Sequence, residues 1–137
     1  MECGIIHLNS LLRSSILFAA ESMYNVKETE YRQLERIEED MMRKLLKTGR
    51  GCPIFQLYLE SGHLPARYYI KRIKLVFYRY ILTQNENSLI FTFLMAQKKQ
   101  PQRGDWYSEI QSIKEDYEIT ISDDEIKRTP ARVFKKT

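Results

Sequence analysis

The chain has 137 residues, of which 43% are hydrophobic, and it carries a formal net charge of +4. This length fits one small domain, the apolar content supplies a core, and the modest charge permits an acidic partner without requiring one. The apolar stretches at residues 16–20 and 89–96 are far shorter than a membrane span. Because residues 1–9 also lack the features of a secretory signal, we expect a soluble intracellular protein, nuclear or cytoplasmic.

Cysteine and histidine are scarce, which argues against a zinc site. Cys3 and His7 have a spacing suited to metal ligands, but Cys52 and His63 lie too far apart to form a second paired unit. We therefore expect reduced thiols, no metal and no cofactor.

The first predicted helix spans residues 10–24. Its apolar residues occupy nearly every face, and Arg13 and Glu21 are its only charges. A helix that is apolar all round is normally central, so we expect this helix to be buried in the core.

The second predicted helix has the clearest ends. Asn25 and Glu28 suit a capping box, Gly49 suits a left-handed C-cap, and Pro53 cannot continue the helix. One apolar stripe faces the core, and the remaining charges, among them Glu38, are most simply a solvated face.

A loop at residues 49–53 and a short helix at residues 54–60 follow. The Gly-Arg-Gly sequence of the loop could hold a phosphate through backbone N–H groups and Arg50. It lacks the Lys-Ser/Thr ending of a P-loop, so nucleotide hydrolysis is not expected. Ser61 and Gly62 close the short helix.

The next predicted helix begins at Pro65 and carries the strongest charge asymmetry of the chain, since no acid occurs between Ser61 and Asn85. Its expected inner face consists of Ala66, Tyr69, Ile70, Ile73, Phe77, Tyr80 and Ile81. A second stripe, expected to face solvent, consists of Arg67, Lys71, Lys74 and Tyr78, extended sideways by Arg72 and Arg79. Bases attract phosphates and an exposed tyrosine can stack on an unpaired base, although a solvated face with snorkelling side chains is the alternative.

Three more elements complete the chain. A helix is predicted at residues 88–97, followed by a basic loop and a helix capped by Asp105. Ser122 and Glu125 suit another capping box before Pro130 and a basic end. We therefore predict an all-α fold of about six helices in a small irregular bundle with a basic C-terminal tail.

The landmarks between residues 11 and 82 resemble the segment that follows the polymerase core in non-LTR (LINE-type) retrotransposon reverse transcriptases. The resemblance is carried by Glu21, Tyr24, Leu34, Glu35, Pro53, residues 57–60, Gly62, Leu64, Pro65 and the basic aromatic run at residues 67–82. A later series, Gln97, Pro101, Gly104, Asp105 and Trp106, resembles the tail of the same proteins. Met23 departs from the pattern, because relatives often carry tryptophan there.

This resemblance implies a post-polymerase, thumb-like segment at residues 1–100 and a helical tail at residues 101–137. It implies contact with an RNA template or an RNA–DNA hybrid, with the upstream polymerase core as a second partner and no membrane. The residues expected to contact nucleic acid are Arg67, Lys71, Arg72, Lys74, Tyr78 and Arg79.

The same resemblance implies that this chain alone is not an enzyme. The aromatic-x-Asp-Asp motif that holds two metal ions is absent, since Asp123 and Asp124 follow Ser122 at a helix cap. We therefore expect a non-catalytic C-terminal fragment of a reverse transcriptase. The alternative is a helical protein-interaction module, or an inactive retroelement remnant, that does not bind nucleic acid.

Overall fold

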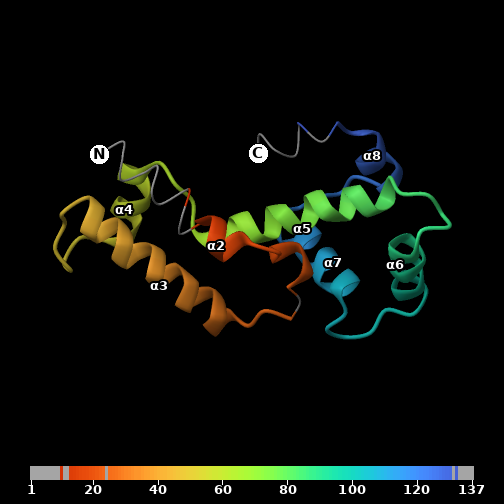
Figure 1. Cartoon of the computed structure of the whole chain (residues 1–137), viewed down its shortest axis with the longest axis horizontal. Coiled ribbons are helices and arrows are strands. Elements are labelled where there is room, and N and C mark those ends of the chain that lie inside the picture. The colour runs from red at the N-terminus through yellow and green to blue at the C-terminus, as the bar shows by residue number, and fades with distance from the viewer. Residues whose placement is uncertain (1–9, 11–12, 24, 131, 133–137) are drawn as a thin grey trace. The chain divides into compact units, whose positions relative to one another are not determined.

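The computed structural model describes residues 10, 13–23, 25–130 and 132 (Figure 1). Within these residues the regular secondary structure consists of helices joined by loops, without strands. The predicted all-α fold class is confirmed. The elements are α2 (Ser14–Leu17), the 3-10 helix η2 (Ala20–Ser22), α3 (Glu28–Leu45), α4 (Ile54–Ser61), α5 (Ala66–Leu82), α6 (Leu89–Lys99), α7 (Trp106–Asp116) and α8 (Asp123–Arg128). No helix in this described part is both long and apolar enough to cross a membrane. Cys3, His7, Tyr24 and the last five residues of the basic tail lie outside it.

The chain divides into two compact units. Unit 1 comprises Met1–Ala20 and Val26–Ile70, and unit 2 comprises Glu21–Asn25 and Lys71–Thr137. The boundary falls inside α5, so the first turns of that helix belong to unit 1 and the remainder belongs to unit 2. Unit 2 takes residues from both predicted segments, 1–100 and 101–137, which were defined by resemblance and stay a prediction.

The prediction of one long, buried first helix is wrong for the residues described. The segment forms only the short elements α2 and η2, and Ala19 between them has a left-handed φ of 54°. Phe18 is largely exposed, whereas Arg13 is buried. The physical reason lies in two contacts: Arg13 pairs with Glu38 in unit 1, and the carbonyl oxygen of Glu21 accepts a hydrogen bond in unit 2.

Helix α3 has different caps from those predicted. At its start, the Glu30 carboxylate accepts a hydrogen bond from the backbone N–H of Lys27 at 2.8 Å, and Asn25 instead has a φ of 55°. At its end, Lys47 adopts the left-handed conformation with φ 52°, and the N–H of Thr48 donates to the Arg43 carbonyl at 3.0 Å. This is a Schellman motif with lysine in the place usually taken by glycine.

Several other predicted ends are confirmed. Gly62 closes α4 with a left-handed φ of 67°. Asp105 is the N-cap residue of α7. At α8, the Glu125 N–H donates to the Ser122 hydroxyl at 3.3 Å while the Ser122 N–H donates to the Glu125 carboxylate at 3.0 Å, which forms the expected capping box.

Each unit has its own buried apolar residues. In unit 1, these include Tyr31, Met42, Leu57, Ala66 and Ile70. In unit 2, one cluster joins α5 to the three helices that follow it. Its members are Tyr78, Ile81, Leu82, Leu94, Ile110, Ile113 and Ile126. Among the described residues of unit 2, helices α5, α6, α7 and α8 therefore share one core, built around the second part of α5.

Candidate functional site

The orientation of α5 differs from the prediction, and this changes the candidate nucleic-acid surface. The buried row along the helix is Ala66, Ile70, Lys74, Tyr78 and Ile81. Steps of three or four residues place such a row on one helix face. The row contains two residues of the predicted solvent-facing stripe, so the prediction that Lys74 and Tyr78 are exposed is wrong. Conversely, Tyr80, predicted to face inward, is half exposed.

Lys74 is the clearest departure, because its relative exposure is 0%. Its ammonium group pairs with the Glu109 carboxylate of α7, and Glu109 itself is largely covered. A lysine that stays charged can be buried in this way only if a carboxylate neutralises it, because an isolated buried charge costs too much free energy. The sequence around Lys74 contains no acid, so local inspection could not reveal this partner.

Tyr78 is 1% exposed, and its hydroxyl group donates to Asp123 Oδ1 at 2.9 Å. Asp123 also accepts a hydrogen bond from Lys98 at 2.7 Å, and the Lys114 ammonium lies 3.6 Å away. Burial, followed by the hydrogen bond to Asp123, raises the pKa of Tyr78. Burial alone would raise the pKa of Asp123, but the hydrogen bonds from Lys98 and Tyr78 hold it below its usual value.

Two further cations of the predicted stripe are also paired with acids. In unit 1, the Arg67 guanidinium makes two bonds to the Glu35 carboxylate, the second at 2.7 Å, and it lies 3.0 Å from Glu28. In unit 2, the Lys71 ammonium lies 3.0 Å from the Asp116 carboxylate. Both cations therefore reach solvent only in part, with their charge already neutralised.

The last two residues of the stripe are engaged as well. Arg79 Nε donates to the carbonyl oxygen of Thr129, the C-cap residue of α8, at 2.6 Å. Arg72 is half-buried and has a partner of its own. Sequence inspection missed these pairings because the acids and the carbonyl come from α3, α7 and α8. The structure thus brings the cations of α5 to other helices and does not bring them together as a free basic patch.

Most exposed cations without an ion pair in the described part of the chain lie instead at or just beyond the C-terminal ends of three helices; the others are Lys27, Arg36 and Arg132. Those at the helix ends are Lys44 in the last turn of α3 with Lys47 and Arg50 beyond it, Lys99 at the end of α6 with Arg103 beyond it, and Lys127 and Arg128 in α8. Residues 41–53, 97–104 and 126–137 contain no acid. Bases at these positions complement the helix dipoles, and they are also available to a phosphate.

A buried polar cluster in unit 1 replaces part of the expected solvated face of α3. The Glu38 carboxylate accepts a hydrogen bond from the Ala66 N–H at 2.9 Å and lies 3.3 Å from Arg13 Nε. The Arg13 guanidinium also donates to the Leu64 carbonyl at 2.8 Å and stacks 4.1 Å from the Tyr69 ring centroid. Burial raises the pKa of Glu38. These contacts tie three segments of unit 1 together, which is a structural role.

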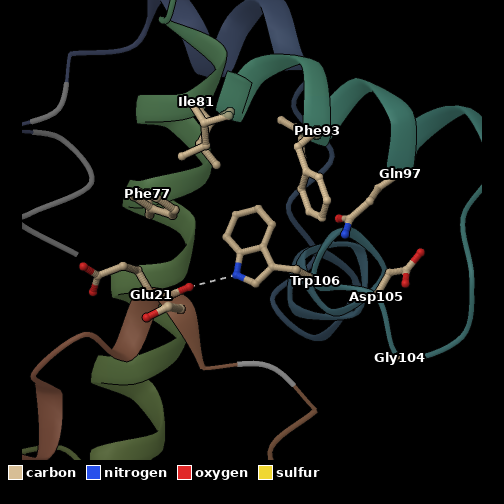
Figure 2. Close-up of a pocket in the computed structure, with 11 residues that line it drawn as sticks. Glu21, Phe77, Ile81, Phe93, Gln97, Gly104, Asp105 and Trp106 are labelled. Atoms are coloured by element: carbon tan, nitrogen blue, oxygen red, sulfur yellow. Dashed lines mark hydrogen bonds between the residues drawn. The ribbon is translucent and has the colours of Figure 1, made fainter. Parts of the chain in front are cut away.

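Unit 2 contains a pocket of about 440 Å³, which is within the usual size range of ligand pockets (Figure 2). Its lining residues come from η2, α5, α6 and the start of α7. They are Glu21, Ser22, Phe77, Ile81, Ile90, Phe93, Leu94, Gln97, Gly104, Asp105 and Trp106. Most of the lining is apolar or aromatic. Four of its residues, Gln97, Gly104, Asp105 and Trp106, belong to the series singled out in the sequence, although that series predicted no pocket.

Among the described residues, no group of three or more His, Cys, Asp or Glu side chains is arranged to hold a metal ion. Comparisons of the chain with protein-family models, with curated proteins and with solved structures find no match. The resemblance to non-LTR reverse transcriptases therefore depends on the sequence landmarks alone and stays a prediction.

Proposed function

We propose that this chain is a non-catalytic, C-terminal segment of a non-LTR retrotransposon reverse transcriptase and that it contacts the RNA template or the RNA–DNA hybrid. The landmarks along residues 11–82 and 97–106 support this proposal. The observation that carries the nucleic-acid contact is the set of exposed, unpaired cations at the ends of α3, α6 and α8, each in an acid-free stretch.

The proposed contact surface differs from the one expected from sequence. Lys74 and Tyr78 are excluded from it because they are buried. The remaining residues of the stripe, Arg67, Lys71, Arg72 and Arg79, could bind phosphate only by giving up internal contacts. The cations at the helix ends need give up none, so they are the better candidates for salt-dependent phosphate binding.

The test measures binding of labelled single-stranded RNA and of an RNA–DNA hybrid by fluorescence anisotropy at several salt concentrations. We expect weak binding with little sequence preference and a linear fall of log affinity with log salt. Absence of binding at low salt would refute the RNA contact. In parallel, the purified chain should not extend a primer on an RNA template with a divalent metal, because two-metal catalysis needs clustered carboxylates. Template-dependent incorporation would contradict the non-catalytic part of the proposal.

A second candidate function is a helical protein-interaction module, and the surface of α4 favours it. Phe55 and Leu59, one helical turn apart, are both largely exposed in unit 1. Two large apolar side chains on one face are suited to a protein partner, and the upstream polymerase core is the partner that the resemblance implies. Replacing both with alanine should weaken co-elution with such a core in size-exclusion chromatography and leave RNA anisotropy unchanged. Unchanged co-elution would exclude this surface.

A further inference from the structure

The pocket of unit 2 has a rigid aromatic wall. Trp106 Nε1 donates to the Glu21 carbonyl oxygen at 2.9 Å, and the indole ring meets Phe77 edge-on, with ring centroids 5.9 Å apart (Figure 2). Tyr78 lies against the same indole at 6.3 Å between centroids. These contacts fix the orientation of Trp106, so its ring can act as a preformed platform.

A second aromatic side chain lies across the pocket and is open to solvent. Phe93 of α6 is 64% exposed even though it lines the cavity, and Figure 2 shows its ring near Trp106. Because the Phe93 ring is exposed at the mouth of an apolar pocket, it can still gain a favourable apolar contact with a ligand. A flat ligand that packs on both rings would remove this apolar surface from water.

Gln97 adds a polar group to this aromatic surface. Its Oε1 accepts a hydrogen bond from the Tyr107 N–H at 3.2 Å, so the acceptor atom of the amide already has a partner. Its Nε2 has no hydrogen-bond partner within the described residues, and the amide end is turned toward Phe93 and Trp106 (Figure 2). A free amide donor beside an aromatic platform can bind an acceptor on the edge of a nucleobase.

The loop that borders the pocket is basic. Gln97 and Gly104, which flank the acid-free stretch Lys-Lys-Gln-Pro-Gln-Arg, both line the cavity. Within the stretch, Lys99 and Arg103 are exposed and form no ion pair in the described part of the chain, whereas Lys98 is paired with Asp123. Cations directly beside a stacking platform are the combination that binds single-stranded nucleic acid with little sequence preference.

Two acids, Glu21 and Asp105, also line the pocket. Glu21 contributes the carbonyl oxygen that holds Trp106, and the Asp105 carboxylate is engaged by the backbone N–H of Gln102 at 2.8 Å. An apolar side chain from a protein would also fit the walls. It would leave the amide donor of Gln97 unpaired and would not use Lys99 and Arg103, so the observations favour a nucleotide.

We propose that the pocket binds one unpaired base of single-stranded RNA, which stacks against Trp106 and Phe93 while Lys99 and Arg103 contact the flanking phosphates. This inference rests on the proposed RNA contact and gives it a specific location. The base is selected by its flat aromatic surface and an acceptor edge, so we expect little preference among the four bases.

Trp106 is the only tryptophan of the chain, so its fluorescence reports on the pocket directly. The full chain is titrated with oligouridylate and with an abasic oligonucleotide of equal length and charge, and anisotropy is recorded in parallel with tryptophan emission. We expect oligouridylate to quench Trp106 over the concentration range in which anisotropy rises. The abasic strand should quench far less.

A matched pair of variants on α6 tests the stacking. Phe93→Ala should weaken binding at least about fivefold, since stacking of one base on an aromatic ring contributes about 1 kcal/mol or more. Leu89→Ala, one turn earlier, is the control, because Leu89 is 86% exposed and does not line the pocket. Circular dichroism establishes that both variants keep their helical content. Equal loss of affinity in the two variants would overturn the stacking assignment.

The outcomes separate this inference from the proposed function. Binding by anisotropy without quenching of Trp106 would refute the pocket and leave RNA contact elsewhere on the chain. No binding of any strand would refute both. Quenching by an amphipathic peptide with an apolar anchor, but not by RNA, would overturn the inference and assign the pocket to a protein partner.

Discussion

Lys74 of α5 and Glu109 of α7 form an ion pair inside unit 2, with the lysine side chain entirely buried and the glutamate side chain 19% exposed. A pair in this position holds α5 and α7 together, because separating the two charges at such low exposure would cost a large free energy. The pair also changes the interpretation of α5: one of the residues that the sequence predicted to contact phosphate is part of the packing of unit 2.

The first prediction follows from this burial. Lys74→Met should lower the free energy of unfolding by about 3–5 kcal/mol, because it leaves the Glu109 carboxylate without its partner. The double variant Lys74→Met with Glu109→Leu should recover most of that stability. Urea denaturation followed by circular dichroism measures both.

Lys99→Met is the matched control, since Lys99 is exposed and unpaired, and its stability should change by less than about 0.5 kcal/mol. Equal unfolding free energies for Lys74→Met and the wild-type chain would show that Lys74 faces solvent after all.

The all-α fold class could be predicted from the sequence, because the periodicity of a helix and the signals at its ends are local features. Gly62, Asp105 and the Ser122–Glu125 box lie where these signals placed them. The buried face of α5 could not be predicted from the sequence, because a buried lysine is recognised only when the acid that pairs with it on another helix is known. The partners of Lys74 and Tyr78 lie 35 and 45 residues away in the chain.

The prediction of one long first helix was wrong for a related reason. An apolar stretch predicts burial, but it does not reveal that the Arg13 guanidinium is drawn to a carboxylate of α3 or that Ala19 turns left-handed. The pocket could not be predicted from the sequence either, although the series from Gln97 to Trp106 supplies part of its lining. Its walls come from α5, α6 and the start of α7 together with Glu21, which are separated by long stretches of chain.

The second prediction concerns Asp123 and the pH dependence of stability. Its pKa is below the usual 3.8 in the folded chain, so the folded state binds this proton less readily than the unfolded state. The resulting stabilisation is fully present above pH 3.8 and is lost as pH falls through the lower, folded pKa.

Asp123→Asn should therefore destabilise the chain at neutral pH and reduce the loss of stability below pH 3.8. Tyr78→Phe removes one of the hydrogen bonds to Asp123 and should cost about 1–3 kcal/mol at neutral pH. Thermal unfolding across pH 2.5–7, about the range of carboxylate titration, measures both effects. An Asp123→Asn variant with the wild-type acid dependence would show that other carboxylates control it.

The third prediction uses the left-handed residue after α3. Lys47 has φ 52°, a conformation that costs a residue with a Cβ about 1–2 kcal/mol, whereas glycine adopts it freely. Lys47→Gly should raise the free energy of unfolding by about 1 kcal/mol in urea denaturation.

Gly49→Ala provides the matched control nearby. A Cβ added at Gly49 meets no atom within 4 Å, and this glycine does not have a positive φ. Its replacement should change stability by less than about 0.5 kcal/mol. If Gly49→Ala proved the more damaging change and Lys47→Gly had no effect, the left-handed cap would be at Gly49, as the sequence alone suggested.

The fourth prediction compares the two basic surfaces in RNA binding. Lys99→Gln combined with Arg103→Gln removes two exposed, unpaired cations, so the slope of log affinity against log salt should fall by about 0.7 for each cation that binds a phosphate. Lys71→Gln should change the slope less, because its ammonium is already paired with Asp116 at 3.0 Å. The measurement is anisotropy of labelled single-stranded RNA at several salt concentrations, with all variants at matched foldedness.

Glu60→Gln with Glu115→Gln is the charge control, since both acids are exposed and their removal leaves the chain more basic by two charges. This variant should bind RNA as well as the wild-type chain or better, because every phosphate-binding cation is kept and net repulsion falls. A larger slope change for Lys71→Gln than for the loop variant would return the RNA-binding surface to α5. In that event the ion pair between Lys71 and Asp116 must open when RNA binds, and Asp116→Asn should then strengthen binding by freeing the lysine.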